Sequence, residues 1–406
     1  MIPPRHQKWL ICILSGFTSG LPFFLLVSLL PAWLRSVHLS LTLIGLSGLM
    51  LMPYALKVFW SPWLDQINPF HLGRRRGWIL VTTVLLFAAF NALGATSGTA
   101  LLSMSFWILI ISVLSASLDT VLDALRREIL EDPELGLGSS LHVNAYKMAG
   151  LIPGALALIL SDHMPWSDVF LMCSLFLIPG IVMGLLLPEP DILHPPSHLA
   201  HAFWQPLRDF LDRHGTRHTI YMLCFIMAYK LGDGLATTLA TPFYLDLGFS
   251  RTSIGLIAKE VGLSASVLGG LLGGLLMLGW PIRRALWIFG VLQSLSIPGF
   301  WFLSRMSHPN LLGLASTVGM EAFSVGLGTT ALIAYMAQET HRRYSASQFA
   351  LLTSAAALPR TLVNASSGWL VHHLGWSSFF LLCWLLSIPG LLLIHGLPVQ
   401  PVKDDG

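Results

Sequence analysis

Charged side chains are scarce in this sequence of 406 residues, where Asp, Glu, Lys and Arg together make up 11%. Soluble globular domains carry about 25% of such residues. Hydrophobic side chains make up 54%, and the mean hydropathy is +0.70. The shortage of charge excludes an ordinary soluble domain and indicates a protein that crosses a membrane several times.

Cysteine is also rare. The four cysteines stand singly inside apolar runs, at Cys12, Cys173, Cys224 and Cys383. A disulfide framework or a cysteine metal site requires closely spaced pairs. The spacing therefore predicts packing residues, and such usage fits a protein of the cytoplasmic membrane.

The chain contains no Walker motif, no nucleophile and base constellation and no metal-ligand signature. We expect no enzyme activity, no cofactor and no metal, and ATP drive would need another subunit. If the chain moves a solute across the membrane, the proton motive force remains as the energy source for that movement. A net charge of +3 does not indicate nucleic acid binding, because Lys and Arg lie mostly at helix ends.

Long apolar stretches separated by short polar breaks fill most of the chain. About 20 apolar residues span a bilayer, and only helices satisfy their backbone groups there. The pattern predicts an all-α integral membrane protein with twelve transmembrane helices. They cover residues 9–34, 41–64, 78–96, 101–126, 138–161, 168–188, 217–245, 253–279, 284–304, 310–338, 345–371 and 376–396.

Basic residues collect in the loops of one side of this topology. That side holds Arg5, Lys8, Arg74, Arg75, Arg76, Arg208, Arg213, Arg217, Arg283, Arg284, Arg342, Arg343 and Lys403, and the other side holds Arg35, Arg251 and Arg305. The positive-inside rule predicts that both termini are cytoplasmic, which an even number of spans requires. The first span is too long for a signal-peptide core and is predicted to stay uncleaved.

Two short segments repeat between the halves of the chain. "SLTLIGL" at 40–46 corresponds to "SRTSIGL" at 250–256, and "RR" followed by "WI" occurs at 74–79 and again at 283–288. Six plus six spans in parallel repeat are the arrangement of major facilitator transporters, whose substrate site lies at midplane. We predict halves at 1–188 and 217–396, a cytoplasmic linker with an amphipathic helix at 189–216, and a cytoplasmic tail at 397–406.

Ionisable residues inside the predicted spans are the candidates for function, since each costs at least about 2.5–3.5 kcal/mol in mid-membrane. They are Lys57, Asp119, Asp123, Lys147, Lys230, Asp233, Lys259, Glu260, Glu321 and Arg360.

"SLDTVLDALRREIL" at 117–130 places two carboxylates, Asp119 and Asp123, one helical turn apart. Carboxylates this close in a low dielectric raise each other's proton affinity, so one of them suits proton coupling. We expect one Asp to pair locally and the other to be left over. We assign the coupling role to Asp119, and we interpret Arg126, Arg127 and Glu128 as a salt-bridge cluster at the cytoplasmic end of the helix.

The second half offers Lys230 and Asp233, spaced i and i+3 and flanked by glycines. This pair either holds the halves in one state or binds substrate or proton. Glu321 is a further proton-carrier candidate. Intramembrane cations suggest an anionic or polyhydroxylated substrate, or they pair with the acidic groups. The predicted substrate-binding residues are Lys57, Lys147, Lys230, Lys259, Asn144, Tyr146, Gln348 and Arg360, and the predicted proton-coupling residues are Asp119, Asp123, Glu321 and Asp233.

The motifs "SGLPFFLL", "MPYALKVFWSPWLD", "LDTVLDALRREIL", "YKLGDGLATTLATPFYLDLGF" and "YSASQFALLTSAAALPRTLVNASSGWLV" resemble the AmpG-type muropeptide permeases of the major facilitator superfamily. The resemblance implies proton-driven import of GlcNAc-anhydromuramyl sugars and peptides for peptidoglycan recycling, with Asp119 as a coupling residue. "WLDQINPFHLGRRRG" is similar to a superfamily loop motif, which implies that Asp65, Arg74, Arg75 and Arg76 brace the outward-open state.

Two departures from the family bear on the substrate. Leu118 stands where a Gln commonly precedes the Asp, and two extra C-terminal helices of some members are not predicted. Siderophore permeases share the "P-x-A-L-K-x-x-W" element, so uptake of a siderophore or another amphipathic anion is the alternative. A membrane sensor or scaffold is a third hypothesis. The expected partners are a small-molecule substrate and the lipid bilayer, and the resemblance implies a monomer in the bacterial inner membrane.

Overall fold

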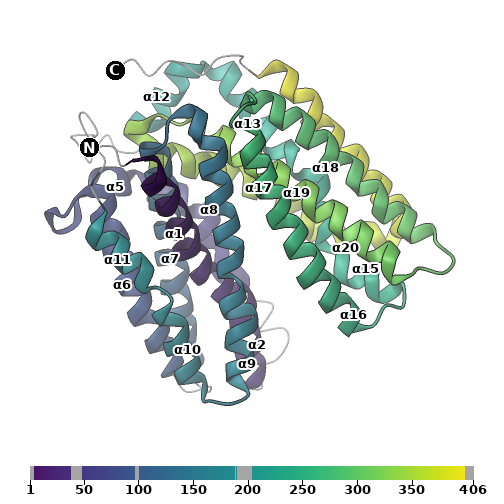
Figure 1. The fold of residues 1–406 in the computed structure, drawn as a ribbon, viewed down its shortest axis with the longest axis horizontal. Helices are drawn as coiled ribbons and strands as arrows, with labels where there is room; N and C mark the ends of the chain where they lie inside the picture. The colour runs from purple at the N-terminus through teal and green to yellow at the C-terminus, as the bar shows by residue number, and fades with distance from the viewer. Residues whose placement is uncertain (1–3, 38–47, 97–99, 188, 190–203, 398–406) are drawn as a thin grey trace. The chain divides into compact units, whose positions relative to one another are not determined.

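The structure is a computed structural model that describes residues 4–37, 48–96, 100–187, 189 and 204–397. Within these ranges the chain forms helices and no strand (Figure 1). The contacts divide the chain into two units. Unit 1 comprises Met1–Glu131, Leu141–Arg208 and Thr340–Ser354, and unit 2 comprises Asp132–Ser140, Asp209–Glu339 and Ala355–Gly406.

Ten helices of the described part are long and apolar enough to cross a membrane. They run over His6–Ser36, Arg74–Gly94, Leu101–Ile129, Asp132–Ser161, Trp166–Leu186, Thr216–Asp246, Ser253–Leu276, Ile282–Arg305, Leu311–Glu339 and Ser367–Gly396. A shorter apolar helix, Leu49–Phe59, falls in the predicted second span, whose residues 41–47 lie outside the described part.

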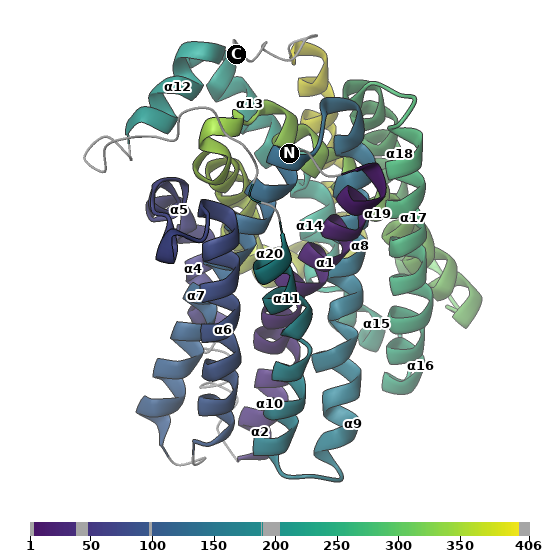
Figure 2. The same ribbon diagram turned by 60° about the vertical axis from the view of Figure 1, so that its left-hand side comes forward.

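Unit 1 is built around long helices that pack side by side. Helix α6 packs against α7, α10 and α11, and α1 packs against α7 and α11 (Figure 2). The helices before the linker are α1 (Arg5–Phe24), α2 (Leu30–Ser36), α4 (Met52–Leu56), α5 (Ser61–Gln66), α6 (Arg74–Gly94), α7 (Leu101–Ile129), α8 (Leu135–Ala149), α9 (Ala157–Ser161), α10 (Trp166–Leu175) and α11 (Ile178–Leu186). Only the part of α8 from Leu141 onward belongs to unit 1.

The predicted second span is a series of short helices and turns. Pro53 and Pro62 each stand at the start of a helix, α4 and α5. A proline lacks the N–H that would continue a helix, which explains the interruptions. Lys57 begins the 3₁₀ turn Lys57–Phe59 that connects the two helices.

In unit 2, α19 packs against both α17 and α18 (Figure 1). The helices that follow the linker are α12 (Trp204–His214), α13 (Thr216–Tyr229), α14 (Leu231–Thr238), α15 (Ala240–Asp246), α16 (Arg251–Leu256), α17 (Leu263–Leu276), α18 (Ile282–Arg305), α19 (Leu311–Glu339) and α20 (Ser345–Leu393). Helix α20 covers the predicted eleventh and twelfth spans and breaks at Gly375, whose φ of 71° favours glycine. The first residues of α12, up to Arg208, and of α20, up to Ser354, belong to unit 1.

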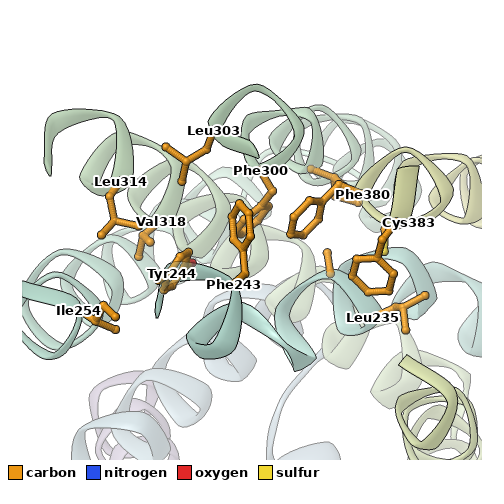
Figure 3. Packing of buried hydrophobic residues seen from close by; sticks show 13 residues of the cluster. Leu235, Phe243, Tyr244, Ile254, Phe300, Leu303, Leu314, Val318, Phe380 and Cys383 are labelled. Carbon is orange, nitrogen blue, oxygen red and sulfur yellow. The ribbon is translucent and has the colours of Figure 1, made fainter. Parts of the chain in front are cut away.

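An aromatic core holds the helices of unit 2 together. Phe243 of α15, Phe300 of α18 and Phe380 of α20 are almost completely buried in one cluster (Figure 3). The rings of Phe300 and Phe380 are stacked, with centroids 5.3 Å apart. Such ring contacts stabilise the fold by about 0.5–1.5 kcal/mol beyond the contribution of the apolar area that they bury.

Candidate functional site

A buried ion pair joins the predicted second and fourth spans. Lys57 Nζ lies 2.6 Å from Oδ2 of Asp119, and Ser19 Oγ of α1 donates a hydrogen bond of 2.8 Å to the other carboxylate oxygen. The side chains of Lys57 and Asp119 are only 4% and 18% exposed. The sequence suggested that Asp119 would have no partner. The structure shows instead that Lys57, 62 positions away, neutralises it.

Two glycines of α1 allow this helix to approach α8 closely. A Cβ at Gly16 would collide with the carbonyl of His142, and a Cβ at Gly20 would collide with the carbonyl of Tyr146. Small residues four positions apart permit such backbone contact between membrane helices. The contact places Tyr146, a predicted substrate-binding residue, beside the helix that carries Ser19.

Aromatic side chains from the segments that carry Ser19 and Lys57 contact one another and Tyr146 of α8. The ring of Phe23 has its centroid 5.3 Å from that of Tyr54 and 5.7 Å from that of Tyr146. Phe24 contacts Tyr146 as well, at 5.5 Å. The Tyr54 hydroxyl forms a hydrogen bond with Ser115 Oγ of α7. Of these aromatic residues, the sequence had singled out only Tyr146.

Asp123 has a different environment from Asp119, although both lie on α7. Its Oδ1 is 2.9 Å from Nη2 of Arg126, which confirms the expected local pair. Nε2 of His142 lies 3.9 Å from the same oxygen, and Nδ1 of His142 is 3.0 Å from Ser15 Oγ. A lone histidine in "LHVNAYK" gave no sequence signal, since only the fold places it beside a carboxylate.

A second group of buried charges gathers around Arg75 at the start of α6. Its Nη2 lies 2.6 Å from Asp65 Oδ1 and 2.6 Å from Glu128 Oε1. Arg74 adds a bond of 3.0 Å to the same Glu128 oxygen. The predicted grouping of Glu128 with Arg126 and Arg127 was therefore wrong. Glu128 binds the arginines of a distant helix because α6 and α7 pack against each other.

Residues from the predicted eleventh span complete this group. Ser345 Oγ donates to Glu128 Oε1, and the backbone N–H of Ser347 donates a bond of 2.9 Å to Asp65 Oδ2. Arg76 lies apart, since its Nε donates to the carbonyl of Gly184 instead. We call Asp65, Arg74, Arg75, Glu128, Ser345 and Ser347 the arginine cluster.

Unit 2 contains the ion pair between Lys230 and Asp233 that the i and i+3 spacing predicted. Nζ of Lys230 lies 2.7 Å from Oδ2 of Asp233 and 3.4 Å from Oε1 of Gln293. The seventh span breaks at Lys230, which separates α13 from α14. A Cβ at Gly232 would approach the carbonyl of Cys383 to 2.5 Å, so this glycine allows α14 to pack closely on α20.

The other predicted site residues lie on several different helices. Gln348 is 1% exposed, and its amide bonds to two backbone groups. Its Nε2 donates to the carbonyl of Pro206, and its Oε1 accepts from the His341 N–H. Asn144 is buried in α8, Lys147 is half-buried in the same helix, and Glu321 is half-buried in α19. The side chains of Lys259 and Arg360 lie outside the described part of the structure.

Within the described ranges, no group of three or more His, Cys, Asp or Glu side chains is placed to hold a metal ion. Cys12, Cys173 and Cys383 are buried and Cys224 is exposed. The groups that meet in unit 1 are paired charges, hydroxyl groups and aromatic rings.

Comparison with known proteins identifies relatives along the whole chain. The sequence model of the Major Facilitator Superfamily matches residues 12–363. An uncharacterized protein of Haemophilus influenzae is 42% identical, over 98% of this chain and 96% of its own length. The anhydromuropeptide permease of Escherichia coli K12 is 38% identical, over 96% of this chain and 79% of its own length.

Solved structures of low sequence identity share the fold. The human organic anion transporter MFSD10 superposes with a TM-score of 0.75 at 16% identity, over 97% of this chain and 100% of its own. The proton:xylose symporter XylE, in complex with a glucose derivative, gives a TM-score of 0.72 at 12% identity, over 97% of both chains. These similarities, together with the membrane helices, confirm the predicted fold. The chain is thus a multi-pass membrane protein of the Major Facilitator Superfamily and belongs to its AmpG-type permeases.

Proposed function

We propose that this protein is a proton-coupled importer of GlcNAc-anhydromuramyl sugars and peptides, which serves peptidoglycan recycling across the bacterial inner membrane. The ion pair between Lys57 and Asp119 is the observation that carries this proposal. The permease name of the Escherichia coli relative supports the substrate class. The positive-inside pattern supports cytoplasmic termini, and the family resemblance supports a monomer.

The ion pair provides a simple way to couple the binding of a proton to the binding of an anion. Taking two charges out of water costs several kcal/mol per ion, so each requires a partner. When a proton neutralises Asp119, the ammonium group of Lys57 loses its counterion and becomes a site for a carboxylate of the substrate. When Asp119 releases the proton, the pair forms again and displaces the substrate. Proton and substrate thus enter and leave together.

The arginine cluster supports a conformational role for the loop motif. It connects the segment after the second span to Ser345 and Ser347, which begin the predicted eleventh span. The predicted topology puts these groups on the cytoplasmic side. We assign Asp65, Arg74 and Arg75 to stabilising the state in which this side is closed, and the structure gives Arg76 a separate helix-end contact.

Transport by purified protein in proteoliposomes tests the proposal. Labelled anhydro-muropeptide is supplied outside, with an inside-alkaline pH gradient, in the presence and absence of a protonophore. We expect saturable accumulation that the protonophore abolishes. Asp119→Asn should abolish uphill accumulation yet retain exchange between labelled and unlabelled substrate, because the permanently neutral side chain resembles the protonated state. Asp162→Asn, a change at an exposed helix end, serves as the matched control.

A parallel assay with a labelled ferric siderophore addresses the alternative substrate. Protonophore-sensitive uptake of the siderophore alone would overturn the assignment of muropeptides. Full accumulation by Asp119→Asn would overturn the coupling role of Asp119. Failure to move either substrate would favour a sensor or scaffold.

A further inference from the structure

An aromatic layer lies one helical turn away from the Lys57–Asp119 pair. Phe23 follows Ser19 by four residues on α1, and Ser115 precedes Asp119 by four residues on α7. Residues four apart share a helix face. The hydrogen bond of Ser115 then brings in Tyr54, which lies three residues before Lys57. On α1, on α7 and on the segment from Tyr54 to Lys57, a residue of the ion-pair layer is therefore followed about one turn away by a residue of the aromatic layer or its hydrogen-bond partner.

Tyr146 of α8 completes the aromatic layer. Its ring contacts Phe23 at a centroid distance of 5.7 Å, and the ring of Phe23 meets that of Tyr54 at an interplanar angle of 79°. The approach of α8 to Gly20 fixes the position of Tyr146. The layer is thus held by the backbone of unit 1 and does not depend on long flexible side chains.

The exposure of these rings distinguishes them from a packing core. Phe23, Tyr54 and Tyr146 are half-buried. In unit 2, by contrast, Phe243 and Phe380 have no exposed surface (Figure 3). In the part of the chain that the structure describes, the hydroxyl of Tyr146 also has no hydrogen-bond partner, whereas that of Tyr54 binds Ser115. A half-buried ring with an available hydroxyl is suited to a ligand that has apolar and polar faces.

A pyranose ring has this character, since its C–H groups form an apolar face and its hydroxyl groups lie around the edge. We propose that Phe23, Tyr54 and Tyr146 form a sugar subsite in unit 1, in which the pyranose packs on the rings while Lys57 binds the carboxylate. The subsite rests on the proposed function and explains the substrate specificity of the transporter. Its ligand is a sugar ring that bears an acidic group, and the aromatic rings select the sugar.

Exchange measurements without a pH gradient test the subsite separately from proton coupling. The probe is labelled GlcNAc-anhydromuramic acid without peptide, and its KM is measured in proteoliposomes. We expect Phe23→Leu and Tyr54→Leu to raise the KM about tenfold, equivalent to ~1.4 kcal/mol, with the maximal rate within twofold. Tyr146→Phe should raise the KM about fivefold, through loss of one hydrogen bond.

Two further variants separate a ligand contact from a structural one. Phe23→Trp keeps an aromatic face and should keep a KM within threefold of the wild type. If Phe23 only filled space, the larger Trp side chain would disturb the packing and would not preserve the KM. Phe106→Leu, on an exposed ring of α7, is the control and should change nothing. Unlabelled peptide without sugar should compete equally well in the wild type and in Phe23→Leu, because the peptide does not need the rings.

The outcomes separate this inference from the proposed function. If the wild type exchanges the disaccharide and the Leu variants keep its KM, the sugar subsite is wrong while the function stands. If the Leu variants lower the maximal rate and leave the KM unchanged, a structural role replaces the subsite. If the wild type exchanges no disaccharide, the proposed function itself fails.

Discussion

The guanidinium of Arg75 lies 2.6 Å from the carboxylate of Glu128, although the two residues are 53 positions apart. Both side chains are almost completely buried. Arg75 shares its Nη2 with Asp65, so one guanidinium is held by two carboxylates. With Arg74, the cluster contains two positive and two negative charges, which balance only while all four side chains are present. Removing one of them should therefore change the stability of the protein.

Removing one charge from the arginine cluster should destabilise the protein strongly. Breaking a buried ion pair costs about 3–5 kcal/mol, because the remaining charge stays buried. We therefore expect Glu128→Gln to lower the thermal unfolding temperature in detergent micelles. Glu131→Gln is the control, because Glu131 is 64% exposed in its pair with Lys8, and an exposed pair contributes about 0–1 kcal/mol. Equal unfolding temperatures for the two variants would contradict this account of Glu128.

The pair between Lys57 and Asp119 should show compensation between two substitutions. Lys57→Met and Asp119→Asn each leave a partner without its counterion, at a cost of about 3–5 kcal/mol. The double variant removes both charges and should recover most of that stability. Thermal unfolding of the four proteins forms a double-mutant cycle. Additive losses would show that the two side chains do not stabilise each other.

Close approach of α1 to α8 should make Gly20 intolerant of a side chain. Its Cβ would collide with the carbonyl of Tyr146, a backbone atom that cannot move aside without shifting the helix. We expect Gly20→Ala to reduce the folded yield several-fold in detergent. At Gly154 a Cβ would meet Ser28 at an ordinary 3.7 Å, so Gly154→Ala should be neutral. A normal yield for Gly20→Ala would contradict the close packing of the helices.

The linker helix α12 should be held in place by the side chain of His214. Nδ1 of His214 is 3.0 Å from the carbonyl of Phe210, and Nε2 is 2.9 Å from Oε2 of Glu339. The contact with Glu339 joins the end of α12 to the end of α19. Removing the imidazole should therefore weaken the attachment of α12.

Hydrogen exchange of residues 204–214 in the wild type and in His214→Ala measures this effect. We expect the backbone amides of α12 to lose protection in the variant, because the contact with Glu339 is gone. Equal protection in both proteins would contradict the attachment through His214.

Local sequence spacing predicted the pairs that lie within one helix. Lys230 with Asp233 and Asp123 with Arg126 are three residues apart, and the helix geometry alone brings each pair together. The partners of Asp119 and Glu128 could not be predicted in this way. Their cations come from other elements, 62 and 53 positions away, and sequence periodicity does not say which helix lies next to which.

Some candidates gained a different interpretation from the fold. Gln348 was predicted to bind substrate, but its amide is occupied by two backbone groups. Phe23 and Tyr54 were not predicted at all, because aromatic residues in apolar runs are indistinguishable from packing residues until their neighbours are known. Their position one turn from a buried ion pair is what makes them candidates.

The sequence by itself determined that the chain is a helical membrane protein, where most of its spans lie and which residues place charge inside them. These properties follow from hydrophobicity and helical spacing, which act over a few residues. The tertiary structure alone decided how the charges and rings of unit 1 combine. Gly16 and Gly20 let α1 approach α8, which places Tyr146 beside Phe23. The packing of α1 on α7 brings Ser19 to Asp119. Such contacts between helices depend on shape complementarity over the whole unit, which sequence spacing does not specify.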